Sequence, residues 1–197
     1  MKIKYMGKLD SETNPLPTNN LKEGAIRFNE PENVKKRYLW TNIIALILVG
    51  IMFVPEYLTV LFRNIDSIDL SNLFIYFILA NILLVLSKLC QFYFYKEIYM
   101  FKIPRVGFAG VYTTEFTKKK YIAINLIPNI IFGFLPYYIS LIIGNYFLGI
   151  AAIFVIAVSV GDLVDVYHAF VEMPPGSKTF LYQFNNYWYL PKKDNSN

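Results

Sequence analysis

The chain has 197 residues, of which 55% are hydrophobic and 18% aromatic, and its mean hydropathy is +0.38. A soluble domain of this length cannot bury so much apolar surface, so the composition excludes an ordinary soluble fold and indicates a membrane protein. The formal net charge of +5 does not indicate nucleic-acid binding, because the basic residues flank apolar runs and do not form one stripe.

The first 37 residues are polar and lack the basic-then-apolar pattern of a cleavable signal. We therefore expect the first apolar run, about residues 39–61, to remain as a membrane anchor. Tyr38 and Trp40 lie at its start, where aromatic rings favour the headgroup boundary, and Pro55 and Glu56 mark its far end.

Three further spans follow from the charge pattern. One covers about residues 70–95, uncharged from Leu70 to Ser87 and interrupted by Lys88. Residues 121–161 contain no ionisable side chain of the Asp, Glu, Lys, Arg or His type. At about 1.5 Å per residue this stretch is about twice the membrane thickness, so it must fold back. Gly144 and Asn145 supply the break, which predicts a hairpin of spans at 121–143 and 146–171.

Basic residues orient these spans. Outside them, 17 Lys and Arg residues fall on one side of the membrane and Arg63 alone falls on the other. Because positively charged short loops stay in the cytoplasm, both termini are predicted to be cytoplasmic in a multi-pass protein of the cell membrane.

The predicted fold class is an all-α membrane protein with four transmembrane helices. Residues 1–37 form a cytoplasmic N-terminal segment, residues 38–171 the transmembrane domain and residues 172–197 a cytoplasmic tail. Alternation around Gly107 and Gly110 predicts a small cytoplasmic β-hairpin over residues 103–116, between the second and third spans. Residues 179–190 are rich in aromatic and β-prone types and are either a second strand pair or an interfacial segment.

Ionisable residues inside spans are costly and therefore mark candidate sites. Lys88 lies about 27 Å below Leu70, and Asp162 lies about 24 Å below Tyr146, counted from the outer ends of their helices. Ser87, Lys88, Gln91 and Asp162 are thus predicted to share one depth near the cytoplasmic boundary. The alternative is that Lys88 extends to the headgroups and that the Asp and His side chains near the end of the fourth span are simply solvated.

A series of short segments is distinctive in its order and spacing: Glu23-Gly24-Ala25, Phe28-Asn29-Glu30-Pro31, Thr113-Thr114-Glu115 with Lys119, Leu126-Ile127-Pro128-Asn129 with Phe132-Gly133, Gly161-Asp162, Val166-Tyr167, Met173-Pro174-Pro175-Gly176-Ser177, and Phe184-Asn185-Asn186-Tyr187-Trp188-Tyr189. Together these segments resemble a family of bacterial membrane proteins described as putative zincin peptidases, with a layout similar to that of site-2 proteases.

The resemblance implies a zinc site, with H-E-x-x-H in the second span and an Asp after a Gly in the fourth. Gly161-Asp162 matches the second element, but the first reads Ser87-Lys88-Leu89-Cys90-Gln91. Ser87 and Gln91 are not competent zinc ligands, and protonated Lys88 cannot act as the general base. We therefore expect no catalytic residues and no cofactor, although the family implies zinc. Asp162 remains as the ligand position.

Cys90, Asp165 and His168 are the nearby residues whose chemistry could relocate a metal. Cys90 lies off the face shared by Ser87 and Gln91, and His168 is poorly spaced from Asp162 for one helical face. A structural ion pair between Lys88 and Asp162 would instead neutralise the carboxylate, and we predict that contact.

Three functions remain open on the sequence. The first is a catalytically inactive peptidase homologue, a scaffold or regulator that contacts the lipid bilayer, a membrane protein partner or an active paralogue. The second is an active intramembrane zinc peptidase with relocated ligands. The third is a small transporter or an immunity-type membrane protein, although four spans without an inverted repeat argue against a transporter. The sequence predicts no nucleic-acid partner.

Overall fold

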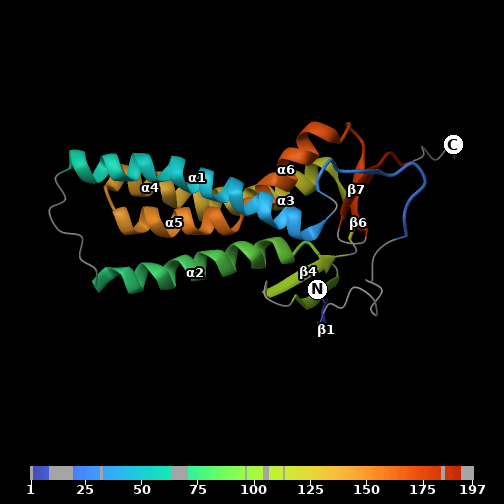
Figure 1. Ribbon diagram of the computed structural model, residues 1–197, viewed down its shortest axis with the longest axis horizontal. Helices are drawn as coiled ribbons and strands as arrows, with labels where there is room; N and C mark the ends of the chain where they lie inside the picture. The colour runs from blue at the N-terminus through green and yellow to red at the C-terminus, as the bar shows by residue number, and fades with distance from the viewer. Residues whose placement is uncertain are drawn as a thin grey trace.

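The computed structural model describes residues 2–8, 20–31, 33–63, 71–95, 97–103, 107–112, 114–182 and 185–191. The helical elements are α1 (Val34–Phe62), α2 (Ser71–Phe92), α3 (Lys118–Asn129), the π-helical turn η1 (Ile130–Phe134), α4 (Leu135–Ile143), α5 (Tyr146–Val158) and α6 (Val160–Glu172). The strands are β1 (Lys2–Lys8), β2 (Ile26–Arg27), β3 (Glu97–Ile103), β4 (Gly107–Tyr112), β5 (Phe116–Thr117), β6 (Lys178–Tyr182) and β7 (Asn185–Tyr189). Figure 1 shows an elongated helical bundle with the strands gathered at one end, here called the sheet end.

Membrane-compatible helices dominate the described part of the chain. Three are long and apolar enough to cross a bilayer, at Lys35–Phe62, Phe74–Phe92 and Lys118–Ile143. The pair α5 and α6 makes a fourth span if it is taken as one, bent by 55°. The bend falls at Ser159, where backbone bonds from the Ser159 amide to two successive carbonyls close the last turn of α5. The sequence did not predict this bend.

The predicted fold class is confirmed in part: the described residues are mostly helical, but they also form two small sheets, so the fold is not strictly all-α. One has the strand order β1-β3-β4, with β1 parallel to β3 and β3 antiparallel to β4. The other has the order β2-β7-β6-β5, in which neighbouring strands are antiparallel. The hairpin that was predicted over residues 103–116 begins earlier, at Glu97, because a strand-forming run directly follows the turn at Tyr93 and Phe94. Residues 104–106 and 113 of the predicted hairpin lie outside the described residues.

Two predicted element boundaries also differ from the structure. Helix α2 ends at Phe92, where the sequence predicted a span continuing to residue 95, and a backbone bond from the Tyr95 amide to the Phe92 carbonyl turns the chain. The predicted start of that span, residue 70, lies outside the described residues. Within residues 179–190, the described segments β6 and β7 form a strand pair, which is the first of the two alternatives left open on the sequence.

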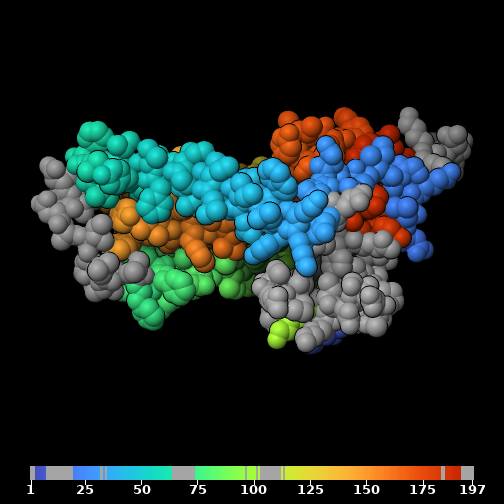
Figure 2. Space-filling model, viewed as in Figure 1, coloured from blue at the N-terminus to red at the C-terminus, as the bar shows by residue number. Residues whose placement is uncertain are grey.

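Helix α5 is the central packing element of the bundle, in contact with α1, α2 and α4. Its small residues Gly149, Ala151 and Ala152 are buried, so neighbouring helices can approach it closely. Such close packing stabilises helix association in membranes, where the hydrophobic effect does not favour contact between helices over contact with lipid. Met52, Tyr137 and Ile156 belong to the buried apolar cluster around it. Figure 2 shows α1 and α2 as the two sides of one face, with α5 visible between them.

A buried polar contact links α1 to α4 in this bundle. Glu56 is fully buried, and its Oε1 accepts a hydrogen bond from the Ser140 hydroxyl. The Tyr137 hydroxyl donates to the Met52 carbonyl at 2.9 Å, one turn before Glu56 on α1. The carboxyl of Glu56 lies directly against Gly149 of α5, so that three helices meet at this one side chain.

Gly149→Ala should therefore destabilise the protein. A Cβ at this position would lie 2.1 Å from Glu56 Oε1, and the buried carboxyl has no solvent into which to move. We expect the free energy of unfolding to fall by about 2 kcal/mol, the usual cost of overpacking, when thermal unfolding is followed in detergent. Gly50→Ala is the matched control, since a Cβ there meets nothing within 4 Å. Equal stabilities of the two variants would contradict the packing described here.

The sheet end has its own apolar core, which joins the strands to the helices. Phe28, Phe116 and Tyr121 are almost fully buried in it, together with Ile98 of β3 and Met173 after α6. Residues from both sheets and from α3 and α6 thus share one cluster, so the strands hold the ends of α2, α3 and α6 in place.

Glu115 ties the N-terminal segment to the last strand at this end. Lys22 Nζ lies 3.0 Å from Glu115 Oε1, and the Tyr189 hydroxyl donates to Glu115 Oε2 at 2.8 Å. Partial burial alone would raise the pKa of Glu115, but the hydrogen bonds from Tyr189 and Lys22 outweigh burial and leave this pKa below its ordinary value of 4.5.

The lowered pKa predicts an acid-sensitive contribution to stability. A carboxylate with a depressed folded-state pKa stabilises the fold above its unfolded pKa, and this contribution is lost as pH falls through the folded value. The wild-type protein should therefore exceed Glu115→Gln in melting temperature at neutral pH, and the gap should close as pH falls below about 4.5. Melting curves across pH 3 to 7 test this, and a gap that is independent of pH would contradict it.

Candidate functional site

The candidate site lies where α2 ends and α6 begins. The bend at Ser159 starts α6 at Val160 and puts Asp162 in its first helical turn, where unpaired backbone amides favour a carboxylate. Lys88 and Gln91 are in the last turns of α2, and α3 ends at Asn129. The end of α2, the end of α3 and the start of α6 therefore meet at this site.

Three side-chain donors converge on a single carboxylate oxygen, Oδ2 of Asp162. Lys88 Nζ lies 2.6 Å from it, Gln91 Nε2 lies 2.8 Å from it, and Asn129 Nδ2 makes a long contact of 3.5 Å. Lys88 Nζ also donates to Gln91 Oε1 at 3.2 Å. The side chains of Lys88 and Asp162 are only 31% and 18% exposed, so the pair is screened less than a surface ion pair.

Ser87 lies next to this cluster and is fully buried. It shares its helical face with Gln91, which is also buried, as their spacing of four residues requires. Within the described part of the chain, the Ser87 hydroxyl has no hydrogen-bond partner. The same is true of Asn129 Oδ1 and the Ser159 hydroxyl, both buried, so this region holds more polar atoms than the surrounding side chains satisfy.

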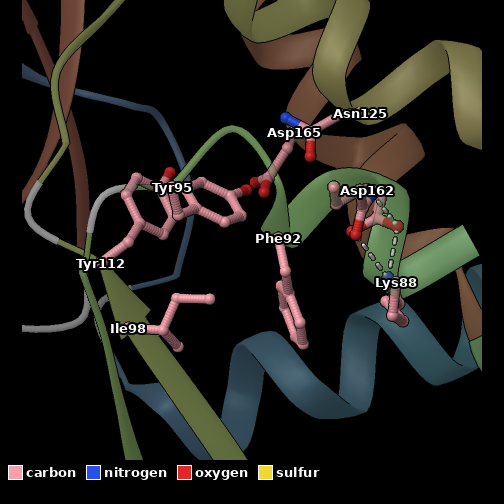
Figure 3. Close-up of a pocket in the computed structure, with 9 residues that line it drawn as sticks. Lys88, Phe92, Tyr95, Ile98, Tyr112, Asn125, Asp162 and Asp165 are labelled. Carbon is pink, nitrogen blue, oxygen red and sulfur yellow. Dashed lines mark hydrogen bonds and ion pairs between the residues drawn. The ribbon is translucent and has the colours of Figure 1, made fainter. Parts of the chain in front are cut away.

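A cavity of about 180 Å³ opens beside the ion pair. Its polar lining comes from Lys88, Gln91, Asn125, Asp162 and Asp165. Its apolar and aromatic lining comes from Phe92, Tyr95, Ile98 and Tyr112. Figure 3 shows Lys88 and Asp162 on one side of the cavity and Tyr95 and Tyr112 on the other, with the Asp165 carboxylate directed toward Tyr95.

The two tyrosines of this cavity do not contribute charge. Burial raises the pKa of Tyr95 well above its ordinary value, and the carboxylates of Asp162 and Asp165 raise it further. Burial also raises the pKa of Tyr112 well above its ordinary value. Both phenols therefore stay neutral at physiological pH.

Not all residues that the sequence singled out meet here. Asp165 lines the cavity and accepts a hydrogen bond of 3.2 Å from Asn186 Nδ2. His168 lies farther along α6, where its Nδ1 contacts Glu172 Oε1 and its ring stacks on Phe28 with centroids 6.0 Å apart. Cys90 is a half-buried free thiol of α2 and does not line the cavity.

The sequence reasoning missed the contribution of α3 and of the aromatic wall. Asn125 and Asn129 are buried, spaced by four residues, and each donates to the carbonyl one turn before it. The presence of two amide side chains inside an otherwise apolar run was the sequence feature that could have identified α3 as part of the site. The π turn η1 begins directly after Asn129, and π turns inside α-helices often occur at functional sites.

The residues at the implied zinc positions do not fit zinc. A hydroxyl and a carboxamide stand where imidazoles are needed, and an ammonium group contacts the one carboxylate that remains. Among the residues that the structure describes, no three His, Cys, Asp or Glu side chains are grouped so that they could hold a metal ion. We therefore derive no chemical step through a metal at this site.

The fold and the site together define a class: helical proteins with membrane-compatible spans and a polar site where those spans end. Comparison with protein families then gives a more specific likeness. The family model described as "Putative zincin peptidase" matches residues 88–178, which include Lys88, the strands β3, β4 and β5, and all of α3 to α6. The match is consistent with a member of that family, whose description implies zinc in its members. Comparisons with curated proteins and with solved structures found no match.

Proposed function

We propose that this protein is a catalytically inactive homologue of membrane zinc peptidases that acts as a membrane scaffold or regulator. The observation that supports the proposal is the Lys88–Asp162 ion pair of 2.6 Å. It joins a cation at the position of the implied general base to the carboxylate at the position of the implied third ligand. An ammonium group can neutralise that carboxylate, but it cannot activate a water molecule as a metal would.

The proposal includes an orientation. The sheet end, with the site beside it, lies on the cytoplasmic side, and both termini lie there as well. The excess of Lys and Arg at this end supports the orientation. A partner would then be a protein of the same membrane, met either through the lipid-facing helices or at the cavity beside Asp162.

Metal content tests the inactive state directly. We expect protein purified from membranes without chelators to contain far less than one zinc per chain, because Ser87, Lys88 and Gln91 supply neither ligand nor base. Elemental analysis of the wild-type protein and of Asp162→Ala measures this. Stoichiometric zinc in the wild type that disappears in Asp162→Ala would overturn the proposal and favour an active enzyme with relocated ligands.

A further inference from the structure

The cavity beside the ion pair has one acidic group without a cation. Lys88 pairs with Asp162 at 2.6 Å, and Arg37 pairs with the buried Glu30 at 2.9 Å. Among the described residues, Asp165 forms no ion pair within salt-bridge distance, and it accepts a hydrogen bond from the neutral amide of Asn186. The groups around the cavity thus leave one carboxylate uncompensated in a half-buried position.

The wall opposite Asp165 is aromatic. The rings of Tyr95 and Tyr112 stack with centroids 4.5 Å apart, and the Phe92 ring lies 6.3 Å from that of Tyr95. Figure 3 shows these rings and the Asp165 carboxylate facing the same space. A carboxylate together with neutral aromatic rings is a combination that binds organic cations, through charge pairing and cation–π attraction.

The size of the cavity limits the ligand to one small group. A cavity of about 150 Å³ holds a benzene molecule, so 180 Å³ accommodates the head of one side chain and not a helix. The cavity is also at the end of α2, the level at which the proposed orientation places the cytoplasmic boundary. Spans of other membrane proteins carry their Lys and Arg residues at this boundary.

We propose that the cavity is a recognition site for a Lys or Arg side chain at the cytoplasmic end of a partner's membrane-spanning segment. The cationic head pairs with Asp165 and lies against Tyr95 and Tyr112. This inference rests on the proposed function and extends it, since it gives the scaffold a partner of defined chemistry. The Lys88–Asp162 pair forms one side of the site and leaves Asp165 as the group that binds the ligand.

The experiment uses the full chain in lipid nanodiscs and a synthetic probe. The probe is an apolar span of about 20 residues with one Arg at its end, and its partner probe carries neutral citrulline in place of Arg. We expect the Arg probe to bind about tenfold more tightly than the citrulline probe, because only Arg pairs with a partly desolvated carboxylate. This comparison needs no protein variant and so does not depend on a variant folding.

Asp165→Asn should remove the preference for Arg, because it keeps the shape and an acceptor for Asn186 but deletes the charge. Glu97→Gln is the matched control, an acidic residue of β3 that does not line the cavity, and it should keep the preference. Equal binding of the two probes to the wild type, or an Arg preference that survives in Asp165→Asn, would overturn the inference.

The same samples separate this inference from the proposed function. Zinc content and cleavage of the probe are measured beside binding. Bound zinc or probe cleavage would refute the proposal of an inactive scaffold. The charge preference of the cavity would still be decided by the comparison of the Arg and citrulline probes. Protein without zinc or cleavage that binds both probes equally would refute only the recognition site.

Discussion

Restoring the zinc motif should convert this chain into a zinc-binding protein. The variant Ser87→His, Lys88→Glu and Gln91→His recreates H-E-x-x-H on α2 and keeps Asp162 on α6. We expect about one zinc per chain in place of little or none, measured by elemental analysis after purification. Zinc at such sites takes three protein ligands and leaves its fourth position open.

The expectation follows from the geometry already present. Gln91 Nε2 lies 2.8 Å from Asp162 Oδ2, and Ser87 shares the buried face of Gln91, so imidazoles at both positions would face the carboxylate. Removing Lys88 also deletes the cation that now contacts Asp162. Asn129, whose amide approaches the same oxygen at 3.5 Å, is placed to orient the carboxylate from outside the ligand set.

Two controls test whether zinc bound by the triple variant is held by the two histidines and Asp162. Adding Asp162→Ala to the restored variant should abolish zinc binding, because only the two histidines would remain on α2. Lys88→Glu alone, without the histidines, should bind no zinc. A restored variant that folds but binds no more metal than the wild type would show that α2 and α6 are not arranged as a remnant zinc site.

Lys88→Met should produce the largest loss of stability at the site. The substitution keeps most of the side-chain volume but leaves Asp162 as a carboxylate that is only 18% exposed and has no cation. Breaking a fully buried pair costs about 3–5 kcal/mol, and the partial exposure of Lys88 reduces the expected cost to about 2 kcal/mol. For a chain of this length the melting temperature should fall by about 5 °C.

The double variant Lys88→Met with Asp162→Asn isolates the charge. Neutralising Asp162 removes the uncompensated carboxylate, so the double variant should recover much of the loss in melting temperature. Lys119→Met is the matched control, since Lys119 is exposed on α3, and its substitution should change stability little. If Lys88→Met and Lys119→Met had equal melting temperatures, the ion pair would not contribute to the stability of the fold.

Much of the bundle could be predicted from the sequence, because a helix that crosses a lipid bilayer needs a run of about 20 predominantly apolar residues. Uncharged runs of sufficient length predicted the helices around Leu70–Ser87 and residues 121–143, and Gly144 with Asn145 marked the turn between α4 and α5. Counting residues from the outer helix ends suggested a common depth for Lys88 and Asp162, and the structure brings their charged atoms within 2.6 Å.

Other features depend on contacts that no local pattern encodes. Strand β1 is a short run with no turn signal, and it pairs with β3, far along the chain. The bend at Ser159 lies inside a run of apolar residues with no proline, so composition alone predicted a straight span. Asn125 and Asn129 became part of the site only because α3 packs against α6, a contact between helices far apart in the sequence.

The pairing of β2 with β7 has a consequence for the order of assembly. Ile26 and Arg27 meet Trp188 and Tyr187, from opposite ends of the described chain. Membrane helices can enter the lipid one after another during synthesis, but this strand pair must wait until the last strand leaves the ribosome. Ile98 and Tyr95 of the cavity wall belong to the same core as Phe28, which follows β2, so we expect this wall to reach its final packing only after β7 has been synthesised.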